Sequence, residues 1–127
     1  MWVEQKIKDY QAMLMEGDGE KVSVLFCRDA EVHSPLYGRI NAGSFYKKLF
    51  KDTQHSSIVL KGIFRNMHNP KQAAALFHYQ WTLNNDKTVS FDCVDIFEFD
   101  EKSKKIKTLL IVYDSQDARS GWQTVRA

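Results

Sequence analysis

The feature that most constrains the fold is a change of hydrophobic period near residue 56. Before it, apolar residues recur at helical spacing, as in the stripe of Val3, Ile7, Tyr10 and Leu14. After it, apolar and polar residues alternate, which is the period of a strand with one buried face. Helices gathered in the first half and strands in the second predict an α+β domain, with helices covering one face of a bent antiparallel sheet.

Capping residues and turns set the expected boundaries. Asp18 and Asn41 are suited to be helix N-caps, and the connections between the later strands are short enough for antiparallel hairpins. The chain has 127 residues and no internal repeat or linker, so we expect one domain, 1–127. The expected elements are helices at 2–16, 19–27 and 42–52, a short strand at 30–34, and strands at 57–67, 73–84, 88–99 and 105–114.

Composition excludes several classes of partner. Eighteen Lys and Arg against sixteen Asp and Glu leave a net charge of +2, which is too balanced for a nucleic-acid-binding surface. No apolar run is long enough to span a membrane, and the first residues lack the apolar stretch of a signal peptide. Cys27 and Cys93 cannot form a disulfide framework, so we expect two reduced core thiols and a cytoplasmic location.

Metal and cofactor motifs are missing from the sequence. The histidines have no His-x-x-x-His spacing, and the two cysteines do not form a Cys-x-x-Cys pair. No glycine-rich loop suited to phosphate binding is present. We therefore expect no metal site and no cofactor.

A single carboxylate stands on an otherwise apolar strand face. In the strand expected at 88–99, Asp95 shares its face with Cys93 and Phe97. Because a buried ionised carboxylate is costly, Asp95 should be protonated, with a raised pKa, or bonded to a buried donor. Such a carboxyl group is a candidate for a functional site. The alternative is a structural acid satisfied by a tyrosine hydroxyl or a backbone amide, and the strand pattern leaves both open.

Two hydroxyl groups are further candidates. Tyr10 lies on the buried stripe of the first helix, and Ser34 shares the apolar face of the first strand with Ala30 and Val32. For each, the pattern favours an ordinary core residue whose hydroxyl finds some partner, and a role in a site is the alternative.

The segments Tyr10–Asp18, Asp29–Pro35, Phe45-Tyr46 and Phe91–Asp100, in this order and spacing, resemble the nuclear transport factor 2-like superfamily. The similarity covers nearly the whole chain and is to the SnoaL-like and ketosteroid-isomerase-like branch. It implies a cystatin-like cone, in which a strongly bent sheet wraps three N-terminal helices around an apolar pocket. The fold hosts many activities, so the resemblance alone does not fix one.

The resemblance also implies roles for individual residues. In ketosteroid isomerase a tyrosine and a protonated aspartic acid form an oxyanion hole, and Tyr10 and Asp95 match these positions. Ser34 stands where the isomerase has its catalytic aspartate, so the base is missing. An epoxide-hydrolase-like site would need an arginine where this chain has Cys93. Tyr113 matches a pocket tryptophan. The residues that we expect to line the pocket are Leu14, Phe45, Phe77, Tyr79, Trp81, Phe97 and Tyr113.

These observations predict a small-molecule pocket protein that binds an apolar ligand with a carbonyl group. Isomerase- or cyclase-like activity is left open, because a replacement base such as His78 or Asp92 would point away from the pocket. The alternative is a non-catalytic protein-interaction module. We also expect a homodimer through apolar residues of the outer sheet face, and a structural ion pair between Asp114 and Arg119.

Overall fold

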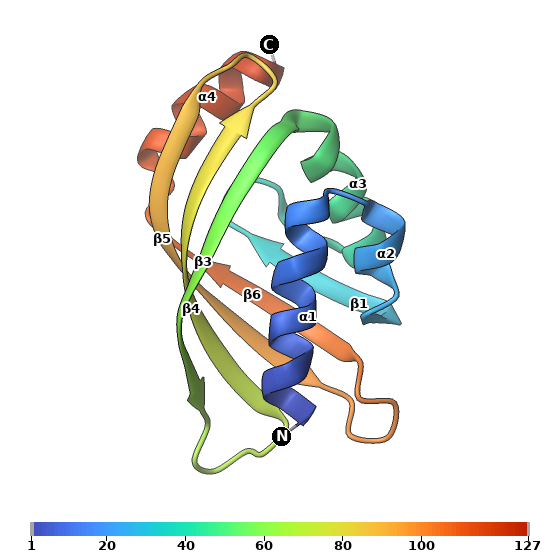
Figure 1. The fold of residues 1–127 in the computed structure, drawn as a ribbon. Coiled ribbons are helices and arrows are strands. Elements are labelled where there is room, and N and C mark those ends of the chain that lie inside the picture. Colours follow the sequence, from blue (N-terminus) through green and yellow to red (C-terminus); the bar gives the residue numbers. More distant parts are fainter. Residues whose placement is uncertain (1, 127) are drawn as a thin grey trace.

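The computed structural model describes residues 2–126 (Figure 1). Three helices and two strands come first, four strands follow, and a fourth helix ends the chain. The elements are α1 (Trp2–Glu16), α2 (Gly19–Ser23), β1 (Phe26–Ser34), β2 (Gly38–Asn41), α3 (Ala42–Asp52), β3 (Thr53–Arg65), β4 (Gln72–Leu83), β5 (Thr88–Phe99), β6 (Ile106–Val112) and α4 (Gln116–Arg126).

The six strands form one mixed sheet in the order β2-β1-β6-β5-β4-β3. Neighbouring strands are antiparallel except β1 and β6, which are parallel. The predicted α+β cone is confirmed, but the expectation of a purely antiparallel sheet is wrong at this one pair. Turn signals in the sequence specify only the pairing of strands that follow one another along the chain. The strands β1 and β6 lie far apart in the sequence, so no turn signal predicts that they pair.

The sheet bends around the three N-terminal helices, which lie on its concave side (Figure 1). Register shifts in β3, between Thr53 and His55 and between Leu60 and Gly62, mark irregular pairing of the kind that bends a strand. The buried residues of α1 are the predicted stripe: Val3, Ile7, Tyr10 and Leu14. They pack against the inward residues of β4, β5 and β6 to make the main core.

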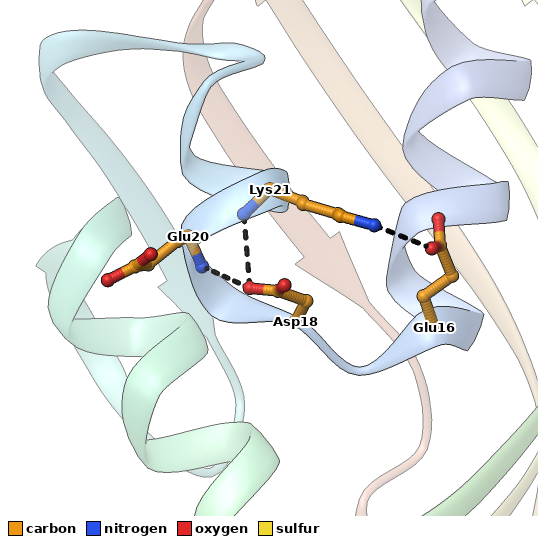
Figure 2. Close-up of polar contacts among 4 residues, drawn as sticks. All are labelled: Glu16, Asp18, Glu20 and Lys21. Atoms are coloured by element: carbon orange, nitrogen blue, oxygen red, sulfur yellow. Dashed lines mark hydrogen bonds and ion pairs between the residues drawn. The ribbon is translucent and has the colours of Figure 1, made fainter.

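Both predicted helix caps are confirmed. The Asp18 carboxylate accepts hydrogen bonds from the backbone N–H groups of Glu20 at 3.0 Å and Lys21 at 3.3 Å (Figure 2). The Lys21 side chain reaches back to Glu16 at 3.1 Å. Asn41 accepts from the Gly43 N–H at 3.0 Å. These contacts satisfy N–H groups that have no partner within the helix.

Several boundaries differ from the prediction. The strands expected at 30–34, 57–67 and 105–114 are Phe26–Ser34, Thr53–Arg65 and Ile106–Val112, and two further differences lie at the second helix and at β2. The second helix ends at Ser23 rather than at residue 27, because Phe26 opens β1 and pairs with Ile106 of β6. The strand β2 is formed by Gly38–Asn41, a segment that carries no alternating pattern and is ordered by pairing with β1. In both places a tertiary contact overrides the local signal.

The C-terminal helix α4 was not predicted. Ser120 and Gly121 lower its helix propensity, so its packing against the sheet must stabilise it. Gly121 lies so near Leu83 that an added Cβ would come within 2.9 Å of that side chain. The helix contacts β4 and β5 and covers a second, smaller core that includes Trp81, Leu83 and Ala118.

Along residues 2–126, no helix combines the length and the apolar character that crossing a bilayer requires.

Candidate ligand-binding pocket

A cavity of about 60 Å³ lies inside the cone, between the helices and the concave face of the sheet. One water needs about 10–15 Å³ by this kind of measure, so the cavity has room for several waters or for a small ligand. None of its lining side chains is a lysine, arginine, histidine, aspartate or glutamate. The lining residues are Tyr10, Leu14, Ser34, Tyr37, Phe45, Leu49, Phe50, Ser56, Tyr79, Trp81, Phe91, Cys93, Ile111 and Tyr113.

Most residues expected at the pocket lie in its wall. Tyr10, Ser34 and five of the predicted lining residues line the cavity. Phe77 and Phe97 do not; both are fully buried in the core, and the ring of Phe97 meets that of Tyr10 edge-on at 5.3 Å. Strand parity places the strand residues of this set, such as Phe77 and Phe97, on the concave face of the sheet. It does not tell which stretch of a bent strand packs against a helix and which stretch borders a cavity.

Asp95 lies on β5 next to residues that line the cavity, but it is not itself one of the lining residues. Its register partner on β6 is Ile111, and Cys93 precedes it on the same face of β5; both of these line the cavity. The carboxyl group is 1% exposed. The Cys93 thiol donates to Oδ1 at 3.0 Å, and Oδ2 has no hydrogen-bond partner within the described chain. Neither a tyrosine hydroxyl nor a backbone amide donates to Oδ2. The interpretation of Asp95 as a purely structural acid predicted such a donor, so it is not supported.

Burial raises the pKa of Asp95 from 3.8 to about 7, and the hydrogen bond from Cys93 opposes this shift. Burial, together with the nearby charge of Asp95, raises the pKa of the Cys93 thiol. Near neutral pH the carboxyl group is therefore divided between a neutral form, which can donate a hydrogen bond, and an ionised form, which cannot. Cys93 stays protonated and is a poor nucleophile.

The hydroxyl of Tyr10 bonds to the hydroxyl of Tyr46 on α3, at 2.7 Å, rather than to Asp95. Burial raises the pKa of both phenols well above the ordinary value, so both remain neutral. One hydroxyl donates to the other, and the second proton is free for another acceptor. Tyr10 lines the cavity and Tyr46 does not. When Tyr46 is the donor, the proton of Tyr10 is therefore available to a ligand.

The sequence did not identify Tyr46 as part of the site. Its signal was a polar atom on the apolar face of a helix, which must find a partner when buried. The sequence could not show that this partner is Tyr10, 36 residues away.

Ser34 cannot act as the missing base. Its Oγ accepts hydrogen bonds from the backbone N–H groups of Leu36 and Tyr37, both at 3.2 Å. Its lone pairs are engaged in holding this turn, and what it can still offer the cavity is its proton. His78 and Asp92 bond to each other at 2.9 Å, and both are half exposed, away from the cavity.

Two other polar groups of the wall, on Tyr37 and Trp81, are tied into the structure. The Tyr37 hydroxyl donates to Asp52 at 2.5 Å, and Asp52 is buried at the end of α3. The Trp81 indole N–H donates to the Thr53 hydroxyl at 2.8 Å. The Tyr37–Asp52 pair was missed, since nothing in either residue's sequence neighbourhood links the turn after β1 to the end of α3. These bonds leave mainly aromatic carbon facing the cavity.

The expected ion pair between Asp114 and Arg119 is wrong. The guanidinium of Arg119 donates to the backbone carbonyl of Pro35 at 2.7 Å. Asp114 instead accepts from the N–H of Gln116 at 3.1 Å, at the start of α4. The ring of Trp122 meets that of Tyr37 edge-on at 5.4 Å. The helix α4 is thus fastened to the turn that carries Leu36 and Tyr37.

No protein-family model and no curated protein matches the chain, but solved structures do. An NTF2-like protein of unknown function from Burkholderia pseudomallei K96243 has a TM-score of 0.78 and 12% identity, over 93% of this chain and 95% of its own. A SnoaL-like polyketide cyclase from Shewanella denitrificans OS-217 has a TM-score of 0.75 and 14% identity, over 95% and 96%.

A protein with a ketosteroid isomerase-like fold from Catenulispora acidiphila DSM 44928, solved with trimethylamine, has a TM-score of 0.77 and 10% identity, over 91% of this chain and 92% of its own. Identities this low establish the fold alone. The three agree with the fold that the sequence resemblance implied.

Proposed function

We propose that this chain, with its NTF2-like fold, is a small-molecule-binding protein whose cavity takes an apolar ligand bearing a carbonyl oxygen. Tyr10 and the protonated form of Asp95 donate hydrogen bonds to that oxygen. The observation that carries the proposal is the unpartnered Oδ2 of Asp95, buried next to the wall of an apolar cavity that Tyr10 lines. Buried polar atoms are almost always bonded, so an orphaned one next to a cavity favours a ligand as its partner.

The surroundings of the two donors support this assignment. Among the described residues, no lysine, arginine or histidine contributes to the shift in the pKa of Asp95. Burial therefore favours the neutral, donating form of its carboxyl group up to a pH of about 7. When Tyr46 donates to Tyr10, the proton of Tyr10 is left for the ligand oxygen. Donors held in place in a dry site stabilise negative charge as it develops on an oxygen. The complex of a similarly folded protein with trimethylamine supports a ligand of small size.

Binding, rather than efficient catalysis, is the activity that we propose. Proton transfer next to a carbonyl needs a base within reach of the bound ligand. Ser34 uses its oxygen to accept two backbone N–H groups, and the His78–Asp92 pair lies on the other face of the sheet. Isomerase- or cyclase-like chemistry would therefore be weak in the native chain.

The test compares cyclohexanone with methylenecyclohexane, which replaces the oxygen by a methylene group. Cyclohexanone should raise the melting temperature of the protein at pH 6, and methylenecyclohexane should raise it much less. The variant Asp95→Asn keeps a donor and should keep the preference, whereas Asp95→Leu should lose it. Equal stabilisation by both ligands, or an unchanged preference in Asp95→Leu, would refute the proposal.

We also propose a homodimer through the outer face of the sheet. On this face Val59, Leu110 and Val112 are 56%, 40% and 48% exposed. Val112 pairs with Val94, and Val94 pairs with Leu76, so apolar residues cross three strands without a break. An exposed apolar patch of this kind is typical of an interaction surface. Protein interaction without any ligand is the alternative function that this same face would serve.

A further inference from the structure

We propose that the cavity also binds a second class of ligand, a small alkylammonium cation such as choline, held by the aromatic wall and by the carboxylate of Asp95. The inference shares its cavity with the proposed carbonyl ligand, but it needs the opposite charge state of Asp95. Either can therefore hold while the other fails.

The wall of the cavity is suited to a cation. Eight of its lining residues are aromatic, and they come from α1, the turn after β1, α3, β4, β5 and the segment directly after β6. The negative faces of aromatic rings attract ammonium groups, and this attraction grows when the site is dry. The rings include the row of Tyr79, Phe91 and Tyr113, stacked at 5.3 and 4.4 Å.

The rings do not all share one orientation. The planes of Tyr37 and Phe45, which stand together in another part of the wall, are 89° apart. A cavity surrounded by rings of different orientation presents faces as well as edges to its contents. An alkylammonium ion also needs no hydrogen-bond donor from the protein, and the Tyr37 hydroxyl and the Trp81 N–H are already turned to Asp52 and Thr53.

The charges around the cavity also favour a cation. No lysine, arginine or histidine lines it, and the ionisable carboxyl group beside it is Asp95, whose Oδ2 is unpartnered. In a site of low dielectric constant, a carboxylate attracts a cation several times more strongly than it would in water, even without direct contact. A cation in the cavity would supply the opposite charge that this buried carboxylate lacks.

The groups that face Asp95 do not compete with it for protons near neutral pH. Each is a phenol or thiol whose pKa is raised by burial, so each stays neutral while Asp95 titrates. These groups are Tyr10 of α1, Tyr46 of α3, Tyr79 of β4, Cys93 of β5 and Tyr113, which directly follows β6. The pH dependence of cation binding should therefore report Asp95.

The sign of that dependence follows from the charge. Burial raises the pKa of Asp95 to about 7, so the carboxylate form is the minor one at pH 6 and the major one at pH 8. A permanently charged ligand that requires the carboxylate should bind roughly tenfold more tightly at pH 8 than at pH 6. A ligand that accepts a hydrogen bond from the neutral acid should show the reverse.

The experiment is calorimetric titration of the wild-type protein with choline and with 3,3-dimethylbutan-1-ol, its uncharged isostere, at pH 6 and pH 8. Choline should bind more tightly than the alcohol at pH 8 and should lose about tenfold in affinity at pH 6. The alcohol should bind equally at both values. This comparison uses one protein, so it does not depend on the folding of any variant.

Two variants test whether Asp95 causes the pH dependence of choline binding. Asp95→Asn should abolish the pH dependence of choline binding, whereas Asp92→Asn should preserve it. Asp92 lies on the same strand but faces outward, bonded to His78, so this control removes a carboxylate without touching the cavity. A retained pH dependence in Asp95→Asn would assign the titration elsewhere and overturn the proposal.

The ligand comparison also separates this inference from the proposed function. Choline that binds no better than the alcohol at pH 8 overturns the inference and leaves carbonyl binding untouched. Choline binding as expected, together with no preference for cyclohexanone over methylenecyclohexane, supports the inference and refutes the carbonyl ligand.

Discussion

Replacing Asp95 by asparagine should make the protein more stable relative to wild type as the pH rises. The side chain is 1% exposed and has a pKa of about 7 in the fold, against 3.8 as its ordinary value. The unfolded chain therefore gives up the Asp95 proton at a lower pH than the folded chain does. A group with a raised pKa contributes stability at low pH that is lost as the pH rises through the folded value.

The magnitude follows from the two pKa values. A difference of about three units corresponds to roughly 4 kcal/mol of unfolding free energy that wild type loses between about pH 4 and pH 8. The asparagine variant has no ionisable group there and does not lose it. All other titrating groups are common to both proteins, so they cancel in the difference.

The assay is urea unfolding of wild type and Asp95→Asn at intervals from pH 4 to pH 8. The difference in unfolding free energy should move steadily in favour of the variant up to about pH 7 and then level off. Asp92→Asn serves as a control: hydrogen bonding to His78 lowers the pKa of Asp92, so this group titrates below the range of the assay and its difference from wild type should stay nearly constant. A difference that stays constant, or that moves in favour of wild type, would refute the buried, unpaired state of Asp95.

Three further predictions concern other parts of the structure. Gly121→Val should destabilise the protein by about 1–3 kcal/mol in urea unfolding, because its Cβ would crowd Leu83, whereas Ser120→Ala on the same helix should cost much less. Ser34→Asp should restore a base near the cavity and raise deuterium exchange at the α-carbons of cyclohexanone by about 10²–10⁴-fold over wild type, measured by NMR; an unchanged rate would contradict the account of the missing base. Leu110→Lys should convert a dimer to a monomer in sedimentation, and a wild-type monomer at micromolar concentration would rule out the proposed dimer.

Residues with strong local signals were predictable from the sequence. The spacing of the apolar residues gave α1 and its buried face, and the caps at Asp18 and Asn41 placed the starts of the next two helices. The isolated carboxylate on an apolar strand face led to Asp95, whose Oδ2 is buried without a hydrogen-bond partner in the described residues. In each case the residues that make the feature predictable lie within a single helix or strand, or at its end.

Features that depend on contacts between distant segments were not predictable. The parallel pairing of β1 with β6, the Tyr10–Tyr46 pair and the Tyr37–Asp52 pair each join residues that no local pattern connects. The helix α4 has weak propensity and forms because its small residues fit against β4 and β5. Asp114 and Arg119 look like an ion pair in sequence, but nearby backbone groups satisfy them first.

The central claim is that a ligand oxygen meets Tyr10 and Asp95 inside the cavity, and a crystal structure of the cyclohexanone complex at pH 6 tests it most directly. The account predicts the carbonyl oxygen within about 3 Å of the Tyr10 hydroxyl and of Oδ2 of Asp95. It also predicts that the Tyr10–Tyr46 hydrogen bond is retained. Cyclohexanone bound outside the cavity, or bound inside it with its oxygen turned away from both residues, would contradict the claim.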